Sequence, residues 1–158
     1  MARLFRMADF PVVCANYDVS ATVLKDLVKP YVVFERDGVK IGVLGLGCQL
    51  EGMVQANKCV GVVYNDPVTV ANEVAAVLKE KEGCDVVVCL SHLGVQYDEN
   101  QLIPKTRNID VVLGGHSHTF MKGPKTLLNM DGKNVSLMHT GKSGIYVGQM
   151  DLTLEKKK

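Results

Sequence analysis

Residues 109–119 carry the sequence Ile-Asp-Val-Val-Leu-Gly-Gly-His-Ser-His-Thr, in which an apolar run ends at two glycines and two histidines follow one residue apart. A shorter version lies upstream, where Asp-Val-Val-Val-Cys-Leu at residues 85–90 is followed by Ser-His-Leu-Gly at residues 91–94. Short continuous apolar runs are typical of strands that are buried on both faces. Each stretch is therefore predicted to be a buried strand that ends at a loop carrying histidine.

Helix signals precede both of these strands. Asp66-Pro67 is a helix start, because aspartate is a favoured N-cap and proline a favoured first residue, and Gly83 is a helix stop. A second, shorter helix is expected to open at a capping box that begins at Asp98 and to lead into the strand at residues 109–113. Alternating helices and strands predict a parallel β-α-β arrangement in the middle of an α/β fold.

The flanking segments predict further strands. Residues 31–36 and 39–46 are joined by the turn pair Asp-Gly and form an expected hairpin, and residues 10–16 are expected to form a short strand. Residues 125–128, 135–139 and 146–154 are expected to add an antiparallel C-terminal part.

Composition excludes several classes of protein. The formal net charge is +1 with mixed signs along the chain, which gives no electrostatic footprint for nucleic acid, so no nucleic-acid partner is expected. We expect no membrane span and see no signal-peptide pattern. The five cysteines include no C-x-x-C pair, so a disulfide framework is not expected. The charged segment at residues 155–158 is expected to be a solvated end.

The histidines at the two strand ends point to metal chemistry. Parallel strands end at one edge of a sheet, where ligands bind in open α/β folds. Imidazole is a good ligand for zinc, manganese or iron. His116 and His118, at i and i+2, would point to the same side of an extended loop, and the preceding Gly114 and Gly115 let the backbone approach an ion, a phosphate or another loop closely.

The alternative interpretation is that these histidines are structural and bind no metal. A histidine after a strand is commonly a hydrogen-bonded loop residue, and His139, inside a strand pattern, is expected to be structural. No carboxylate in the histidine loops is an obvious general base, so no catalytic residue is assigned. A dinucleotide-binding fold is not supported, because Gly42, Gly45 and Gly47 lack the G-x-G-x-x-G spacing and no helix signal follows.

Several segments together resemble the second half of the calcineurin-like metallophosphoesterase domain, in its bacterial 5'-nucleotidase/UDP-sugar hydrolase branch. The Ser-His-Leu-Gly loop and the Ile-Asp-x-x-x-Gly-Gly-His-Ser-His-Thr loop are similar to the ligand loops of that branch. The segments at residues 10–16, 39–45 and 144–148 agree as well, so the resemblance spans about residues 10 to 154.

The resemblance implies part of a layered α/β/β/α sandwich with a dinuclear site of divalent metals: zinc, manganese or iron. His92 and His116 match the histidine ligands of one metal, and His118 matches a position that ligates the other. The family's D-x-H, G-D and G-N-H-[DE] motifs do not occur in the chain. We therefore expect residues 1–158 to be a single partial domain without the N-terminal metal motifs and the C-terminal nucleotide-recognition domain, and metal binding to be weak or absent.

The implied function is hydrolysis of phosphate esters of nucleotides or other phosphoesters, with this chain alone inactive. A periplasmic or cell-surface location is implied by the same resemblance. We also expect self-association through a sheet edge left without its neighbours. The alternative is a non-catalytic α/β module with structural histidines or a single weak metal site.

Overall fold

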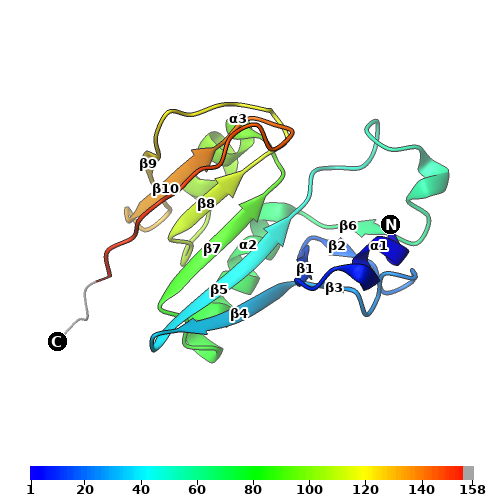
Figure 1. The fold of residues 1–158 in the computed structure, drawn as a ribbon, viewed down its shortest axis with the longest axis horizontal. Helices are drawn as coiled ribbons and strands as arrows, with labels where there is room; N and C mark the ends of the chain where they lie inside the picture. The colour runs from blue at the N-terminus through cyan, green and yellow to red at the C-terminus, as the bar shows by residue number, and fades with distance from the viewer. Residues whose placement is uncertain (155–158) are drawn as a thin grey trace.

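A computed structural model describes residues 1–154 and places a six-stranded mixed sheet at the centre of the chain (Figure 1). The charged segment at residues 155–158 lies outside the described residues. The strand order is β4-β5-β7-β8-β10-β9. The bounds are Tyr31–Arg36 for β4, Val39–Leu46 for β5, Val86–Ser91 for β7, Val111–Gly114 for β8, Lys125–Leu128 for β9 and Asn134–His139 for β10.

The middle of this sheet is parallel, as predicted. Strands β5, β7, β8 and β10 run in one direction, while β4 is antiparallel to β5 and β9 is antiparallel to β10. The antiparallel C-terminal part is confined to the β9–β10 hairpin, because β10 itself pairs in parallel with β8. The predicted strand at residues 146–154 is wrong: β10 already has a partner on each side, and Ile145, Tyr146 and Val147 are exposed.

The first predicted helix is confirmed. Helix α2 (Pro67–Ala76) continues as a π-helical turn, η2 (Val77–Lys81). The Asp66 carboxylate accepts a hydrogen bond of 2.8 Å from the Thr69 amide, which satisfies one of the unpaired amides of the first turn. Gly83 follows with a φ of 68°, in the left-handed conformation that ends many helices.

The second helix begins earlier than predicted. It runs through α3 (Val95–Tyr97), the π-helical turn η3 (Asp98–Leu102) and the 3-10 turn η4 (Ile103–Lys105). The Ser117 hydroxyl accepts a hydrogen bond of 3.1 Å from the Val95 amide, so a distant loop caps this helix. Asp98 is therefore not its N-cap; it lies one turn inside the helix and is buried.

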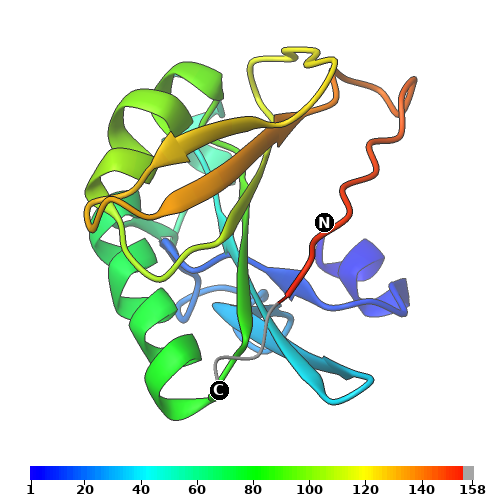
Figure 2. The same ribbon diagram turned by 90° about the vertical axis from the view of Figure 1, so that its left-hand side faces the viewer.

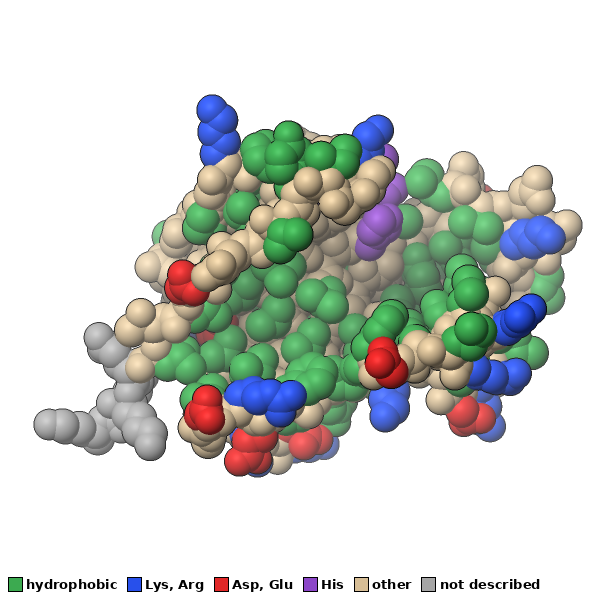
Figure 3. Space-filling model, in the orientation of Figure 1, with side chains coloured by type: hydrophobic (Ala, Val, Ile, Leu, Met, Phe, Trp, Pro, Cys, Tyr) green, Lys and Arg blue, Asp and Glu red, His purple; other side chains and the backbone are tan. Residues whose placement is uncertain are grey.

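Helix α2 and the helix that begins with α3 lie together on one face of the sheet (Figure 2). Between that face and the helices lies the core, which contains Leu44, Leu46, Ala71, Ala75, Leu78, Val87, Cys89, Leu102, Ile103, Val112 and Leu137. On the opposite face hydrophobic side chains gather at the surface (Figure 3). Leu90 and Leu113, which are register partners, are each 40 % exposed, so this face has no complete covering layer.

An N-terminal segment packs at one end of the sheet. It contains α1 (Ala2–Met7), a parallel pair of β1 (Val12–Val13) and β3 (Val28–Lys29), and an antiparallel pair of β2 (Tyr17–Asp18) and β6 (Val63–Tyr64), with the 3-10 turn η1 at Ala56–Lys58. The predicted strand at residues 10–16 is thus reduced to β1. None of the helices in the described part of the chain is long and apolar enough to cross a membrane.

Candidate metal centre

Three parallel strands end side by side and set the position of the centre. The last register pairs join Leu46 of β5 to Ser91 of β7, and Ser91 to Gly114 of β8. Two backbone hydrogen bonds of 2.8 Å then link the loops, from the His92 amide to the Leu46 carbonyl and from the Gly115 amide to the Ser91 carbonyl. The first residues after each strand are therefore held next to each other.

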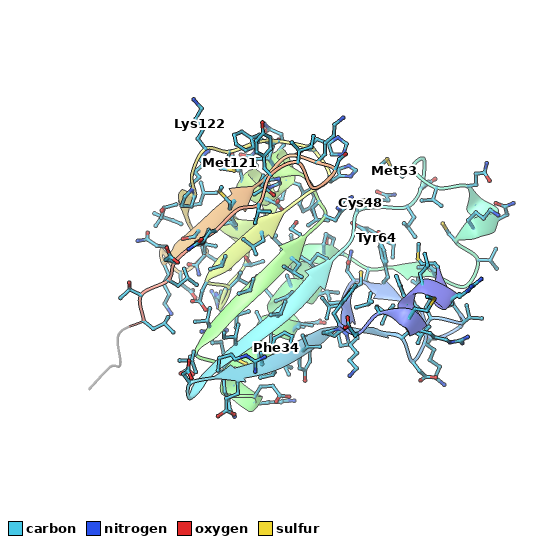
Figure 4. All side chains as sticks on the ribbon, viewed as in Figure 1. Phe34, Cys48, Met53, Tyr64, Met121 and Lys122 are labelled. Atoms are coloured by element: carbon cyan, nitrogen blue, oxygen red, sulfur yellow. The ribbon has the colours of Figure 1, made fainter. Side chains whose placement is uncertain are left out.

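His92, His116 and Cys48 meet at this edge. The ligand atoms of these three side chains all lie within 4.8 Å of one another. The two imidazole rings stand edge to face, with their centroids 5.1 Å apart. Figure 4 labels Cys48 where the chain leaves β5. Histidine side chains are visible beside the hollow between the main sheet and the N-terminal segment in Figure 3.

The donor set suits a divalent metal. Ligands that share a tetrahedral zinc ion lie roughly 3.5 Å apart, so small side-chain rotations would bring these three atoms onto one ion. Among the described residues, neither His92 nor His116 makes a side-chain hydrogen bond to the protein. The nitrogen lone pairs of both rings are therefore free to bind a ligand, unlike those of a structural histidine.

The surroundings of His92 favour the neutral form of its ring. Partial burial and the neighbouring rings of His116 and His118 lower the pKa of His92, because a cation there would lose hydration and would meet further positive charge. A neutral imidazole is the form that binds metal.

His118 and His139 have different surroundings. His118 is exposed and does not join the cluster of three, although it is close enough to affect the pKa of His92. The loop is not extended as expected, because His116 and His118 adopt φ angles of 68° and 55°. Such left-handed conformations are costly for residues other than glycine and are concentrated at functional sites. His139 is buried in β10, as its strand pattern predicted.

A buried polar network lies directly beneath the loops. The Asp98 carboxylate accepts hydrogen bonds from the Ser91 hydroxyl at 2.5 Å and from His139 Nε2 at 2.9 Å. His139 Nδ1 is buried without a partner, so we place the ring proton on Nε2, where it is donated to Asp98. Ser91 directly precedes His92, and therefore the network fixes the strand end from which His92 projects.

The paired glycines are required by side chains of the protein. A Cβ at Gly114 would overlap the His139 ring, and one at Gly115 would lie 3.1 Å from His92 Nδ1. Both positions thus leave room for imidazoles. The adjoining hollow of about 420 Å³ is lined by Val13, Cys14, Tyr17, Leu46, Gly47, Leu90, Ser91, His92, Leu113, Gly114 and Gly115.

Sequence reasoning missed Cys48 and Asp98. Cys48 sits in a stretch without periodicity, but it follows the end of β5 as His92 follows β7, so the strand-end argument could have found it. Asp98 looked like a capping residue, and no local signal identifies its buried partners.

A comparison with models of protein families finds no match. The 5'-nucleotidase of Vibrio cholerae is 32 % identical over 132 residues, which is 74 % of this chain and 24 % of that protein. The crystal structure of a 5'-nucleotidase precursor from Thermus thermophilus is 30 % identical with a TM-score of 0.80, covering 87 % of this chain and 29 % of that one. The calcineurin-like phosphoesterase YfkN of Bacillus subtilis is 29 % identical with a TM-score of 0.61, covering 73 % and 40 %.

The chain spans less than a third of the curated relatives that it matches. The sequence similarity to these relatives extends over most of this chain, and so does the fold that it shares with the Thermus protein. Both include the strands that lead to His92 and His116. The chain belongs to the calcineurin-like phosphoesterases, in their 5'-nucleotidase branch.

Proposed function

We propose that this chain supplies the histidine metal ligands of a metal-dependent phosphoesterase that hydrolyses phosphate esters of nucleotides. The observation that carries the proposal is the convergence of His92 and His116 at the ends of two adjacent parallel strands, in a chain related to 5'-nucleotidases. In this proposal these rings hold one divalent metal, and His118 holds a second. Bound metals of this kind polarise a phosphoester and activate water.

The chain's own residues position these ligands. The Ser91–Asp98–His139 network orients the end of β7, and the Ser117 hydroxyl ties the second histidine loop to the Val95 amide. His92 is exposed and lines an open hollow, so a substrate phosphate can reach it from solvent.

We propose further that the 158-residue chain alone has little or no activity and binds metals such as manganese weakly, because the family motifs that carry carboxylate and asparagine ligands do not occur in it. In this proposal residues 1–158 form a single partial domain. The periplasm or cell surface is the proposed location, by analogy with the family.

Two assays test these proposals. A longer protein that contains the chain and the D-x-H and G-N-H-[DE] motifs should hydrolyse 5'-AMP with manganese, and His116→Ala should reduce the rate by more than about 1000-fold. Unchanged hydrolysis in His116→Ala would remove the histidines from the mechanism. The 158-residue chain should not hydrolyse p-nitrophenyl phosphate with manganese; a rate that His116→Ala abolishes would contradict its inactivity.

We also propose that the 158-residue chain associates with a second copy. Strand β4 lies at an edge of the sheet, and the face that carries Leu90 and Leu113 exposes apolar surface. Unpaired edges and apolar faces favour pairing between chains. Light scattering should show a mass above that of a monomer at micromolar concentrations, and a monomeric mass throughout would contradict the proposal.

A further inference from the structure

Three strand ends, and not two, supply a metal-binding side chain to this edge. Cys48 follows β5 by two residues, and its sulfur joins the two imidazoles in a cluster whose ligand atoms lie within 4.8 Å. The resemblance to phosphoesterases assigned the two histidines but not the cysteine. A thiol also changes the chemistry of the donor set, since sulfur is softer than the oxygen ligands of carboxylates.

The segment that carries Cys48 is fixed by specific contacts. The Asn16 side chain accepts from the Gly47 amide and donates to the Gly47 carbonyl, at 2.8 Å in both cases. The Tyr17 hydroxyl donates a hydrogen bond to the Cys48 carbonyl, and the Tyr17 ring fills the space beside Gly47. These contacts hold the Cys48 backbone beside the histidines before any ion arrives, which reduces the entropic cost of binding.

We propose that Cys48 is a metal ligand that joins His92 and His116 in a zinc-selective Cys-His₂ site. Zinc takes both thiolate and imidazole ligands, and three protein ligands leave a fourth tetrahedral position open, as in catalytic zinc sites. Manganese prefers oxygen ligands, so its binding stays weak. When the zinc–sulfur bond forms, the thiol proton passes to solvent.

The proposal rests on the proposed function for the two histidines, and it adds which metal they hold and through which third ligand. It is tested on the 158-residue chain with metal ions alone. Cys48→Ser is the principal variant, Cys48→Ala removes any weak ligation by the serine hydroxyl, and Cys59→Ser is the matched control because Cys59 is similarly half-buried but outside the cluster.

Isothermal titration calorimetry with zinc chloride should show one site per chain in the wild type and in Cys59→Ser. Both Cys48 variants should bind zinc more than about 100-fold more weakly, since loss of a direct ligand exceeds the effect of losing an outer hydrogen-bond partner. Cobalt(II) should give a near-ultraviolet sulfur-to-cobalt charge-transfer band in the wild type and the control, and the Cys48 variants should lack it. Circular dichroism establishes that each variant is folded.

Zinc affinity in Cys48→Ala equal to that of the wild type, or a cobalt complex without the sulfur band, would overturn the proposal. A melting temperature raised by zinc in the wild type but not in Cys48→Ala gives a second, independent test. Zinc binding through Cys48 combined with no hydrolysis by the longer protein would leave this inference standing and remove the proposed function. Histidine-dependent hydrolysis by that protein, together with unchanged zinc binding in the Cys48 variants, would support the proposed function and overturn the inference about Cys48.

Discussion

Replacing Gly114 by alanine tests whether the buried His139 ring requires a glycine at the end of β8, below the histidine loop. The added Cβ would lie 2.6 Å from His139 Cδ2 and closer still to the other two nearest ring atoms, Cε1 and Nε2. Favourable carbon contacts lie at about 3.5–4.0 Å, so the ring has to move. It cannot rotate freely, because His139 is buried and its Nε2 is 2.9 Å from the Asp98 carboxylate.

The loss in the free energy of unfolding depends on the contacts that the His139 ring loses when it moves. Overpacking a core position costs about 1–3 kcal/mol, and separating the partners of a buried ionic hydrogen bond costs about 3–5 kcal/mol because a buried group is left unpaired. These two terms describe one displacement, and we take about 3–5 kcal/mol as the total loss in the free energy of unfolding. For a chain of this size that corresponds to a melting temperature lowered by roughly 6–20 °C.

Urea denaturation followed by circular dichroism measures this loss. Gly123→Ala is the matched control, because a Cβ there has no atom within 4 Å and the backbone is not left-handed. That variant should be neutral or more stable by up to about 1 kcal/mol, since alanine reduces the entropy of the unfolded chain.

The double-mutant cycle decides the cause. In a His139→Ala background the imidazole is gone, so Gly114→Ala should then cost less than about 1 kcal/mol. The coupling between the two positions should therefore be about 2–4 kcal/mol. Additive effects, or a Gly114→Ala variant as stable as the wild type, would show that Gly114 is not required by the His139 ring.

Three further predictions concern other parts of the fold. Hydrogen bonds from the Thr69 hydroxyl and amide lower the pKa of Asp66, so its helix cap contributes stability above the unfolded pKa of about 3.9 and loses it as the pH falls through the lower folded value. Asp66→Asn keeps the cap without titrating, and its melting temperature should fall less than that of the wild type between about pH 5 and pH 2; parallel profiles would contradict this. Gly45→Ala would place a Cβ 2.8 Å from the Val13 carbonyl carbon, in main chain that cannot rotate away, and should cost about 1–3 kcal/mol in urea denaturation. Leu113→Lys puts a charge on the open sheet face and should lower the mass seen by light scattering; an unchanged mass would place the contact elsewhere.

The sequence was sufficient to predict the elements with strong local signals. The strands at residues 31–36, 39–46 and 85–90 are correct within one residue because their apolar runs are long and bounded by turns or a helix stop. The strand predicted at residues 146–154 is wrong because a strand needs a partner, and both neighbours of β10 were already taken. Pairing of this kind is a property of the whole sheet, which a local pattern does not contain.

Some residues of the candidate site have a local sequence signal and others have none. His92 and His116 follow apolar strands in an obvious pattern, whereas the position of Asp98 depends on where its helix begins. That start is set by Gly94, with a φ of 92°, and by the Ser117 hydroxyl, which comes from a loop 22 residues later in the chain. The capping box at Asp98 is a local signal, and the tertiary contact overrides it.

The four parallel strands also show why similar strand-end residues receive different roles. His92 lies one residue beyond the last register pair of β7, and Cys48 and His116 lie two residues beyond those of β5 and β8, so all three lie past the paired strand residues. His139 is itself the last register partner of β10, opposite Gly114. A residue within the ladder has its side chain fixed to one face, and for His139 that is the helix face, where Asp98 lies. A side chain one or two residues past the end of the strand can therefore reach a metal. A side chain on the last paired residue packs beneath the site instead.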